Sequence, residues 1–477
     1  MKRQLFKALA IIVSAFLLVG CTPRLNNPET NYDVNLDVVS NYEVEGTLKV
    51  GITSIYTERW LIDALIEEYN QVYPNVEVKV DEVQGAYNNT LVGYWQAEQN
   101  TPGIMPDILV SNSTDMHSII ENGILLDLQK YVDESVKAGL LDLSDFHEDY
   151  WKLGQENFNG DQYVLPRSAD RVVTHLNQTL FETIFKDYSD DELPFTPIEG
   201  TKVPANGWTW QEFMDTCEVI RKWYDDNGRK EQYLVDAYFD WEPIFNAIFR
   251  SEGAELIDKD QNVLVDTPEV KKSVELMNEC IEKRYVAPPG TSVQGNYEGG
   301  QGIMLFNSAY AQRFYTSLTI DQQYDYNLTT FPLINGEEGP SYIGAGVAGY
   351  AMASTSRNKD LAWTFLLFML SKDGQNALAS GGMTTLPIRK DLEDPATNVW
   401  GKNLMDKGIN MSAYTYGTER CVITDYYLNT GKPNIYNDLM TRVSEMLNTS
   451  LGRDEATRSQ KIAECQEYLE YLIESAR

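Results

Sequence analysis

The sequence has few of the residues and motifs that most enzyme active sites use. Only three histidines occur among 477 residues, His117, His147 and His175, and none belongs to an H-E-x-x-H motif. The motifs G-x-S-x-G and G-x-x-x-x-G-K are absent as well. We therefore expect no enzyme activity, no metal and no cofactor. A glycoside hydrolase stays open as an alternative, because 71 acidic residues offer many carboxylate pairs.

Cysteine is also scarce. Apart from Cys21, the chain has Cys217, Cys280, Cys421 and Cys465, which lie far apart in the sequence. Because no two of them form a C-x-x-C pair, the sequence supports neither a zinc site nor a thioredoxin-like redox site. An even number permits disulfides and fits buried thiols equally well, so the sequence leaves their state open.

Positive charge is in short supply relative to negative charge. Lys and Arg number 39 against 71 Asp and Glu, which gives a net charge of -32. A field of this sign repels phosphate backbones, so the sequence excludes nucleic acid as a partner. Aromatic residues, in contrast, make up 11% of the chain, led by 29 tyrosines. This exceeds the usual need of a core, and we expect some of these rings at a binding surface.

No uncharged run is long enough to cross a membrane as a mature helix. Lys2, Arg3 and Lys7 precede a short uncharged run over residues 8–20, which is typical of a signal peptide over residues 1–20. The run ends in Leu18-Val19-Gly20-Cys21, which resembles the bacterial lipobox. We therefore expect lipidation of Cys21 and a flexible polar tether over residues 21–45. The protein would then be anchored to the cell membrane and face the extracellular side, or the periplasm if an outer membrane is present.

Alternating strands and helices begin near Gly46. Residues 47–52 and 76–80 alternate like strands, and apolar residues at helical spacing lie between them. With a third strand at 107–110, this βαβ pattern predicts an α/β fold with an open, mostly parallel sheet. Ligands of such sheets bind beyond the carboxyl ends of the strands. Strand-end position therefore makes Tyr56, Arg59 and Asn112 candidate binding residues, and loop position adds Tyr436.

Two motifs resemble ligand sites but lack a necessary part. Residues 344–349 match G-x-G-x-x-G, yet the residues that follow read as a strand instead of a helix. We interpret these glycines as a flexible or closely packed backbone segment. The acidic residues over 258–269 occupy EF-hand ligand positions, but Val263 stands where the sharp turn requires glycine, so a β-hairpin turn is favoured.

The order of short segments along the chain resembles a known family. The similarity is to the extracellular solute-binding proteins of bacterial ABC importers, the family that includes the maltose-binding protein. The segments that carry it are Leu48-Lys49-Val50, Tyr73-Pro74-Asn75-Val76, Pro106-Asp107-Ile108-Leu109, Gly123-Ile124-Leu125-Leu126-Asp127-Leu128, Tyr163-Val164-Leu165-Pro166, His175-Leu176-Asn177, Trp208-Thr209-Trp210-Gln211-Glu212-Phe213, Ser251-Glu252-Gly253-Ala254-Glu255-Leu256, Gly302-Ile303-Met304, Phe331-Pro332-Leu333, Ala362-Trp363-Thr364-Phe365 and Leu386-Pro387-Ile388-Arg389.

The resemblance implies a type II periplasmic-binding-protein-like fold with two lobes, each an open, mostly parallel sheet flanked by helices. The N-terminal lobe would comprise residues 46–168 and 307–350, and the C-terminal lobe residues 169–306 and 351–477. A hinge between the lobes would close them on a ligand. The implied function is capture of a carbohydrate, with an oligosaccharide as the expected kind, by a monomer that delivers it to ABC permease subunits. A binding protein for another solute is the first alternative.

The same resemblance places sugar-binding groups at particular positions. It implies an acidic residue at the cleft, Asp170, and aromatic rings for stacking on sugars at Tyr238, Trp241 and Tyr310. The chemistry agrees, because a sugar offers an apolar C–H face to a ring and paired hydroxyls to a carboxylate. Each of these residues could instead belong to the core or to the surface.

Overall fold

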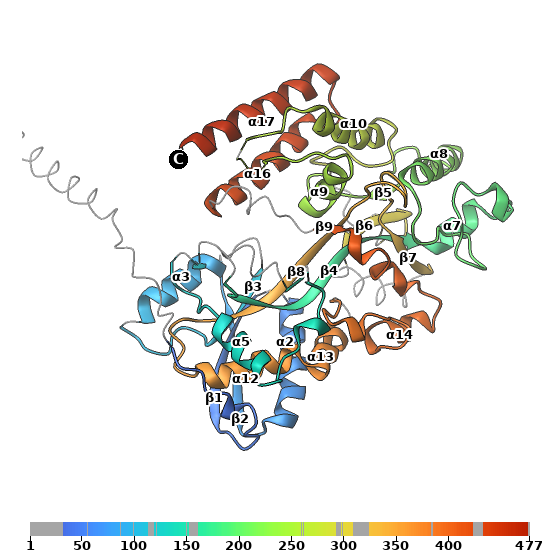
Figure 1. Ribbon diagram of the computed structural model, residues 1–477. Coiled ribbons are helices and arrows are strands. Elements are labelled where there is room, and N and C mark those ends of the chain that lie inside the picture. The colour runs from blue at the N-terminus through green and yellow to red at the C-terminus, as the bar shows by residue number, and fades with distance from the viewer. Residues whose placement is uncertain are drawn as a thin grey trace, which may run out of the picture.

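The structure is a computed structural model of the chain (Figure 1). It describes residues 32–54, 56–85, 87–98, 100–112, 119–120, 122–148, 150–151, 161–258, 260, 262–291, 297, 299–308, 324–382, 385–422 and 433–475. The expected signal peptide, Cys21 and Tyr310 lie outside these residues.

The first part of the chain forms the expected βαβ unit. Strand β1 (Gly46–Thr53) pairs in parallel with β2 (Val76–Val83), and helix α2 (Tyr56–Val72) connects them. After helix α3 (Tyr87–Glu98), strand β3 (Ile108–Asn112) pairs in parallel with β1. Right-handed crossover connections place the helices on the faces of such a sheet.

Two long strands run through the middle of the sheet and link the two halves of the molecule (Figure 1). They are β4 (Val164–Asn177) and β8 (Ile343–Met352), which pair antiparallel to each other. The strand order is β2-β1-β3-β8-β4-β6-β5, with β7 beside β4 and β9 beside β8. Because β8 also pairs antiparallel with β3, the sheet is mixed where the sequence predicts it to be mostly parallel.

Other elements complete the two halves. These are α5 (Gln129–Lys137), α7 (Gln178–Ile184), α8 (Trp210–Asp226), β5 (Val235–Asp236), α9 (Glu242–Ser251), α10 (Pro268–Glu282), β6 (Met304–Ser308), β7 (Tyr326–Thr330), α12 (Lys359–Leu370), α13 (Lys372–Gly382), α14 (Val399–Met405), β9 (Cys421–Val422), α16 (Pro433–Ser450) and α17 (Glu455–Ser475). The short 3-10 helices of the described residues are η1 (Leu36–Val38), η2 (Leu143–Asp145), η3 (Asp190–Glu192), η4 (Lys390–Leu392), η5 (Met411–Tyr414) and η6 (Thr418–Arg420).

Buried apolar side chains form two large cores, one on each side of the crossing strands. The first core joins β1 and α2 with α12, α13 and α14. The second joins α8, α9 and α10 with the C-terminal helices α16 and α17. We call the parts of the molecule around these cores the first lobe and the second lobe.

The packing of α12 to α14 differs from the expected lobe boundaries, which assign all of residues 351–477 to the second lobe. Helix α12 is apolar on almost every side, so it has to be covered by protein all round. Trp363 in this helix is fully buried in the first core, where its indole N–H donates to Ser135 Oγ at 2.9 Å. The chain thus returns to the first lobe after β8 and reaches the second lobe again at β9, which pairs with Ile343 and Gly344 beside α9.

Residues 32–45 pack along the first lobe, in contrast to the flexible tether expected there. The hydroxyl of Tyr32 donates to the carbonyl of Asp127 at 2.6 Å, and its ring stacks on Tyr131. Farther along, Tyr73 donates to the carbonyl of Val39 at 2.7 Å. The apolar side chains of this segment cover the first core and account for the packing. We call residues 32–45 the strap.

The four cysteines after Cys21 are free thiols. Burial raises the pKa of Cys217, Cys280 and Cys465, so these thiols are poor nucleophiles.

Across the described residues, no group of three His, Cys, Asp or Glu side chains could hold a metal ion. Within the same residues, no helix is both long and apolar enough to span a bilayer.

Candidate functional site

The crossing strands carry a short accessible stretch at their centre. Asp170 is half-buried, whereas every other residue of β4 is buried. It pairs with Gly346 in β8, and Gly346, Val347 and Ala348 are the half-buried residues of that strand. The two accessible stretches therefore coincide, and solvent reaches the sheet between the two lobes at this point.

The carboxylate of Asp170 is hydrogen-bonded to the backbone of the next residue in the strand. Its Oδ1 accepts a hydrogen bond from the backbone N–H of Arg171 at 2.8 Å. A carboxylate has about four lone-pair sites and can accept more than one hydrogen bond. The structure thus places the predicted acidic residue at an accessible position between the lobes.

The first turn of α9 lies directly against β8 near Asp170. A Cβ at Gly344 would lie 2.1 Å from the carbonyl O of Pro243, so only glycine permits this approach. Gly344 precedes Gly346 by two residues, about 7 Å along a strand. The glycine segment over residues 344–349 is therefore closely packed strand, as one of the two sequence interpretations predicts.

Tyr238 and Trp241 sit at the start of α9. Trp241 is the residue before the helix and packs partly against the second core. The backbone carbonyl of Tyr238 accepts a hydrogen bond from the backbone N–H of Trp241, and Tyr238 is 46% exposed. Helix α9 contacts β8 at Gly344, two residues from Gly346, which pairs with Asp170, so the start of α9 lies on the same part of the crossing strands. The binding roles of Asp170, Tyr238 and Trp241 stay predictions.

On the first lobe, a buried ion pair links β4 to α2. The guanidinium of Arg167 contacts Glu58 at 2.5 Å, and the side chains are 3% and 14% exposed. Burial favours a lower pKa for Arg167, but Glu58 and Tyr350 outweigh it and the pKa is raised. The pair attaches the first turn of α2 to the crossing strand. Sequence reasoning missed it, although an arginine within an apolar strand was a signal of a buried partner.

The structure gives less information on the other predicted binding residues, Arg59, Tyr56, Asn112 and Tyr436. Arg59 pairs with Asp63 in its own helix at 2.9 Å and with Glu82 at 3.4 Å, and these acidic partners raise its pKa. Tyr56 begins α2, Asn112 ends β3 and Tyr436 lies in α16. The side chains of these three residues are outside the described part of the structure, so their roles stay predictions.

A polar network lies beside Asp170 on β4. Arg171 donates through Nη1 to the carbonyl of Tyr416 at 2.9 Å and is buried. Near it, His147 Nε2 lies 3.2 Å from Glu393 Oε2, and Thr418 donates to the other oxygen of Glu393. The contacts from His147 and Thr418 lower the pKa of Glu393, so this carboxylate is held in its charged form. The network fixes the strand on which Asp170 lies.

The sequence matches a known family over most of its folded part. Residues 57–376 match the model described as bacterial extracellular solute-binding protein. The chain belongs to this family. No curated protein matches the sequence of this solute-binding protein.

Solved structures show the same fold at low sequence identity. The GacH receptor of Streptomyces glaucescens, solved without ligand and with acarbose, is 17% identical with a TM-score of 0.67, covering 91% of this chain and 99% of its own. Lmo0181 from Listeria monocytogenes, in complex with cycloalternan, is 16% identical with a TM-score of 0.67 and coverage of 90% and 99%. UgpB from Mycobacterium tuberculosis, in complex with glycerophosphocholine, is 15% identical with a TM-score of 0.67 and coverage of 91% and 100%.

Proposed function

We propose that this solute-binding protein captures a carbohydrate between its two lobes and delivers it to the permease of an ABC importer. One observation carries the proposal: Asp170 is the accessible residue of β4 and lies opposite the accessible stretch of β8. Tyr238 and Trp241 add aromatic faces in the same region. A carboxylate beside aromatic rings suits a sugar, which presents hydroxyls and apolar C–H faces.

The fold neighbours support an oligosaccharide as the ligand. GacH was solved with acarbose and Lmo0181 with cycloalternan. Both ligands are built from several sugar units. A non-sugar solute is the second candidate, because UgpB has the same fold and was solved with glycerophosphocholine. An aromatic site with a carboxylate would also attract a quaternary ammonium group.

Binding without chemistry is part of the proposal. The family consists of solute-binding proteins, and no catalytic motif is present in the sequence. The alternative of a glycoside hydrolase predicts that an oligosaccharide incubated with the protein is shortened. We expect chromatography to recover it intact, and release of shorter products would reject the proposal.

The location follows from the family and from the N-terminal sequence. Members of the family are extracellular. We propose in addition that Cys21 is lipidated, that residues 1–20 are removed and that a monomer faces outward on the cell membrane. The variant Cys21→Ala is expected to appear in the soluble fraction. If fractionation finds it in the membrane as often as the wild type, the anchor proposal fails.

The test of ligand class is a thermal-shift screen of the purified chain. Glycans of increasing length and glycerophosphocholine form its two arms. A ligand at about 100 times its Kd adds about 2.7 kcal/mol to stability, which is readily seen as a rise in melting temperature. A rise with oligosaccharides supports the proposal. A rise with glycerophosphocholine alone would replace it with the second candidate.

A further inference from the structure

The first lobe contains a polar pocket that is separate from the crossing strands. It encloses about 600 Å³ and is lined by β1, β2, the segment before β3 and the segment between β8 and α12. Thr47 and Lys49 lie in the first half of β1, whereas ligands of such sheets bind beyond the carboxyl ends of the strands. The volume is within the range of small-molecule sites.

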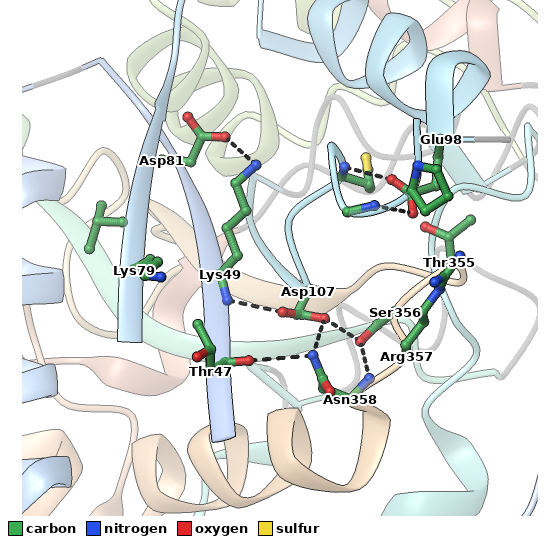
Figure 2. Close-up of a pocket in the computed structure, with 14 residues that line it drawn as sticks. Thr47, Lys49, Lys79, Asp81, Glu98, Asp107, Thr355, Ser356, Arg357 and Asn358 are labelled. Atoms are coloured by element: carbon green, nitrogen blue, oxygen red, sulfur yellow. Dashed lines mark hydrogen bonds and ion pairs between the residues drawn. The ribbon is translucent and has the colours of Figure 1, made fainter. Parts of the chain in front are cut away.

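The lining of this pocket is held in place by its own hydrogen bonds (Figure 2). Glu98 accepts from the backbone N–H groups of Gly103 and Met105 at 2.7 and 2.9 Å. Asp107 accepts from the backbone of Lys49 at 3.0 Å and from Ser356 at 2.6 Å.

The ammonium of Lys49 is also bound into this framework. It contacts Asp81 at 3.1 Å and donates to the carbonyl of Ile104 at 2.9 Å. Each carboxylate of the lining therefore has a partner: Asp81 pairs with the Lys49 ammonium, whereas Glu98 and Asp107 accept hydrogen bonds from neutral N–H and O–H groups.

Two cationic side chains of the lining are not bound into this framework. Arg357 is exposed. No residue in the described part of the chain accepts a hydrogen bond from its guanidinium or forms an ion pair with it. Lys79 contacts Glu77 at 3.1 Å, but both side chains are more than half exposed, so this pair is weak. Lys79 and Arg357 lie on opposite sides of the pocket (Figure 2).

We propose that this pocket binds a small phosphate monoester that carries hydroxyl groups. The phosphate would contact Arg357, because a guanidinium recognises a phosphate through paired N–H groups, and the ammonium of Lys79 across the pocket would add a positive charge at longer range. Two cations match a group with a charge of about -2, which a phosphate monoester has near neutral pH. The carboxylates of Asp81 and Glu98 retain lone pairs that can accept from hydroxyls of the ligand.

The phosphate could come from a soluble metabolite or from a lipid headgroup. The strap contacts the same end of α12: the backbone N–H of Asn35 donates to Asp360, three residues after Arg357. If Cys21 is lipidated, the eleven residues from Cys21 to Tyr32 reach at most about 40 Å. The membrane would then lie within reach of the pocket, and the two sources require separate experiments.

Calorimetry on the complete mature chain tests the proposal, and the test is independent of carbohydrate binding. Glycerol 3-phosphate, inorganic phosphate and glycerol are the soluble probes. Glycerol 3-phosphate is expected to bind the wild type more tightly than inorganic phosphate, and Arg357→Gln is expected to weaken it at least about tenfold. Lys79→Gln should weaken it less. The matched control is Lys222→Gln, an exposed lysine of α8 in the second lobe, which changes the net charge equally.

Each outcome supports or overturns the site. If no phosphate compound binds the wild type, or Lys222→Gln weakens binding as much as Arg357→Gln does, the site does not exist as proposed. Equal affinity for inorganic phosphate would reject the hydroxyl-bearing ligand. Binding to vesicles with phosphatidic acid, but to neither phosphatidylcholine vesicles nor glycerol 3-phosphate, would assign the phosphate to a lipid. Arg357→Gln is expected to keep the melting temperature and the carbohydrate affinity of the wild type, which separates this test from that of the proposed function.

Discussion

Tyr238 and Trp241 lie three residues apart but differ in burial, and this difference separates two roles for an aromatic residue. Tyr238 is 46% exposed, so its truncation removes little from the core. Tyr238→Ala is expected to weaken carbohydrate binding by about 1 to 3 kcal/mol, at least about fivefold, with the melting temperature unchanged. Calorimetry beside a ligand-free melting curve measures both. Wild-type affinity in a folded Tyr238→Ala variant would remove this ring from the site.

Truncation of Trp241 is expected to change both the affinity measured by calorimetry and the melting temperature without ligand. Its ring packs partly against the second core, so Trp241→Ala should lower the melting temperature as well as the affinity. The comparison of the two variants therefore distinguishes a ring that contacts ligand alone from one that also supports α9.

Substitution of Asp170 by Asn tests whether its negative charge contributes to sugar affinity, because the two side chains have nearly the same shape. Asp170→Asn replaces a charged acceptor by a neutral amide, so the affinity for a sugar should fall by about 1.5 to 3 kcal/mol. Calorimetry at fixed pH checks this. Asp63→Asn, an exposed carboxylate in α2 that pairs with Arg59, is the control with the same change of net charge. An equal loss in both variants would indicate a general effect of charge and contradict a specific role for Asp170.

His175 predicts a pH dependence of stability. It is fully buried in β4, where Nδ1 lies 2.7 Å from the Tyr326 hydroxyl, and burial lowers its pKa from 6.5 to about 3. Between pH 6.5 and 3 the unfolded chain binds a proton that the folded chain does not. This group therefore costs stability as the pH falls through that window, by about 1.4 kcal/mol per pH unit at most.

Denaturant unfolding at several pH values measures this slope in the wild type and in His175→Gln. The slope below pH 6.5 is expected to be smaller in the variant. If the variant does not fold, NMR titration of the three wild-type histidines gives the same information. A midpoint near 6.5 for His175 in the folded protein would contradict the prediction.

At the scale of elements, the contact between α9 and β8 determines whether the aromatic residues lie beside Asp170. Gly344→Ala would place a Cβ 2.1 Å from a backbone oxygen, so α9 has to shift. We expect a loss of about 1 to 3 kcal/mol in the free energy of unfolding and weaker ligand binding. Gly346→Ala is the matched control, because a Cβ at Gly346 meets no atom within 4 Å. Denaturant unfolding that finds the two variants equally stable would contradict the close approach.

The sequence contained enough information for the elements but less for their partition between the lobes. Alternation over residues 47–52 and 76–80, with helical spacing between them, predicted β1, β2 and α2, because local periodicity reflects which side of each element is buried. The return of α12 to the first lobe depends on contacts such as Trp363 with Ser135, which lie 228 residues apart. Periodicity does not record such long-range contacts. The strap was missed for the same reason, since its few apolar residues are recognised as packed only when their partners are known.

The residues of the candidate site come from resemblance to the family, which indicated Asp170, Tyr238 and Trp241. The structure shows Asp170 half-buried on β4 and the two aromatic residues at the start of α9, and their roles in binding stay predictions. The pair of Arg167 and Glu58 was not predicted, because the sequence does not show which of 71 acidic residues meets a given arginine. Tyr310 stays a prediction from resemblance.

At the scale of the whole molecule, the central claim is that a carbohydrate binds between the two lobes and draws them together. Two cores joined by the long strands β4 and β8 permit such a motion, because the strands can bend between the cores while each core stays packed. Closure reduces the radius of gyration, whereas binding on the outside of one lobe leaves it unchanged.

Small-angle X-ray scattering tests this claim most directly. The chain is measured alone and with a saturating concentration of the oligosaccharide that raises its melting temperature most. Asp170→Asn at the same sugar concentration, below its own Kd, is the control. We predict a smaller radius of gyration for the wild type with sugar and no change for the control. An unchanged radius in the sugar-saturated wild type would contradict closure of the lobes on the ligand.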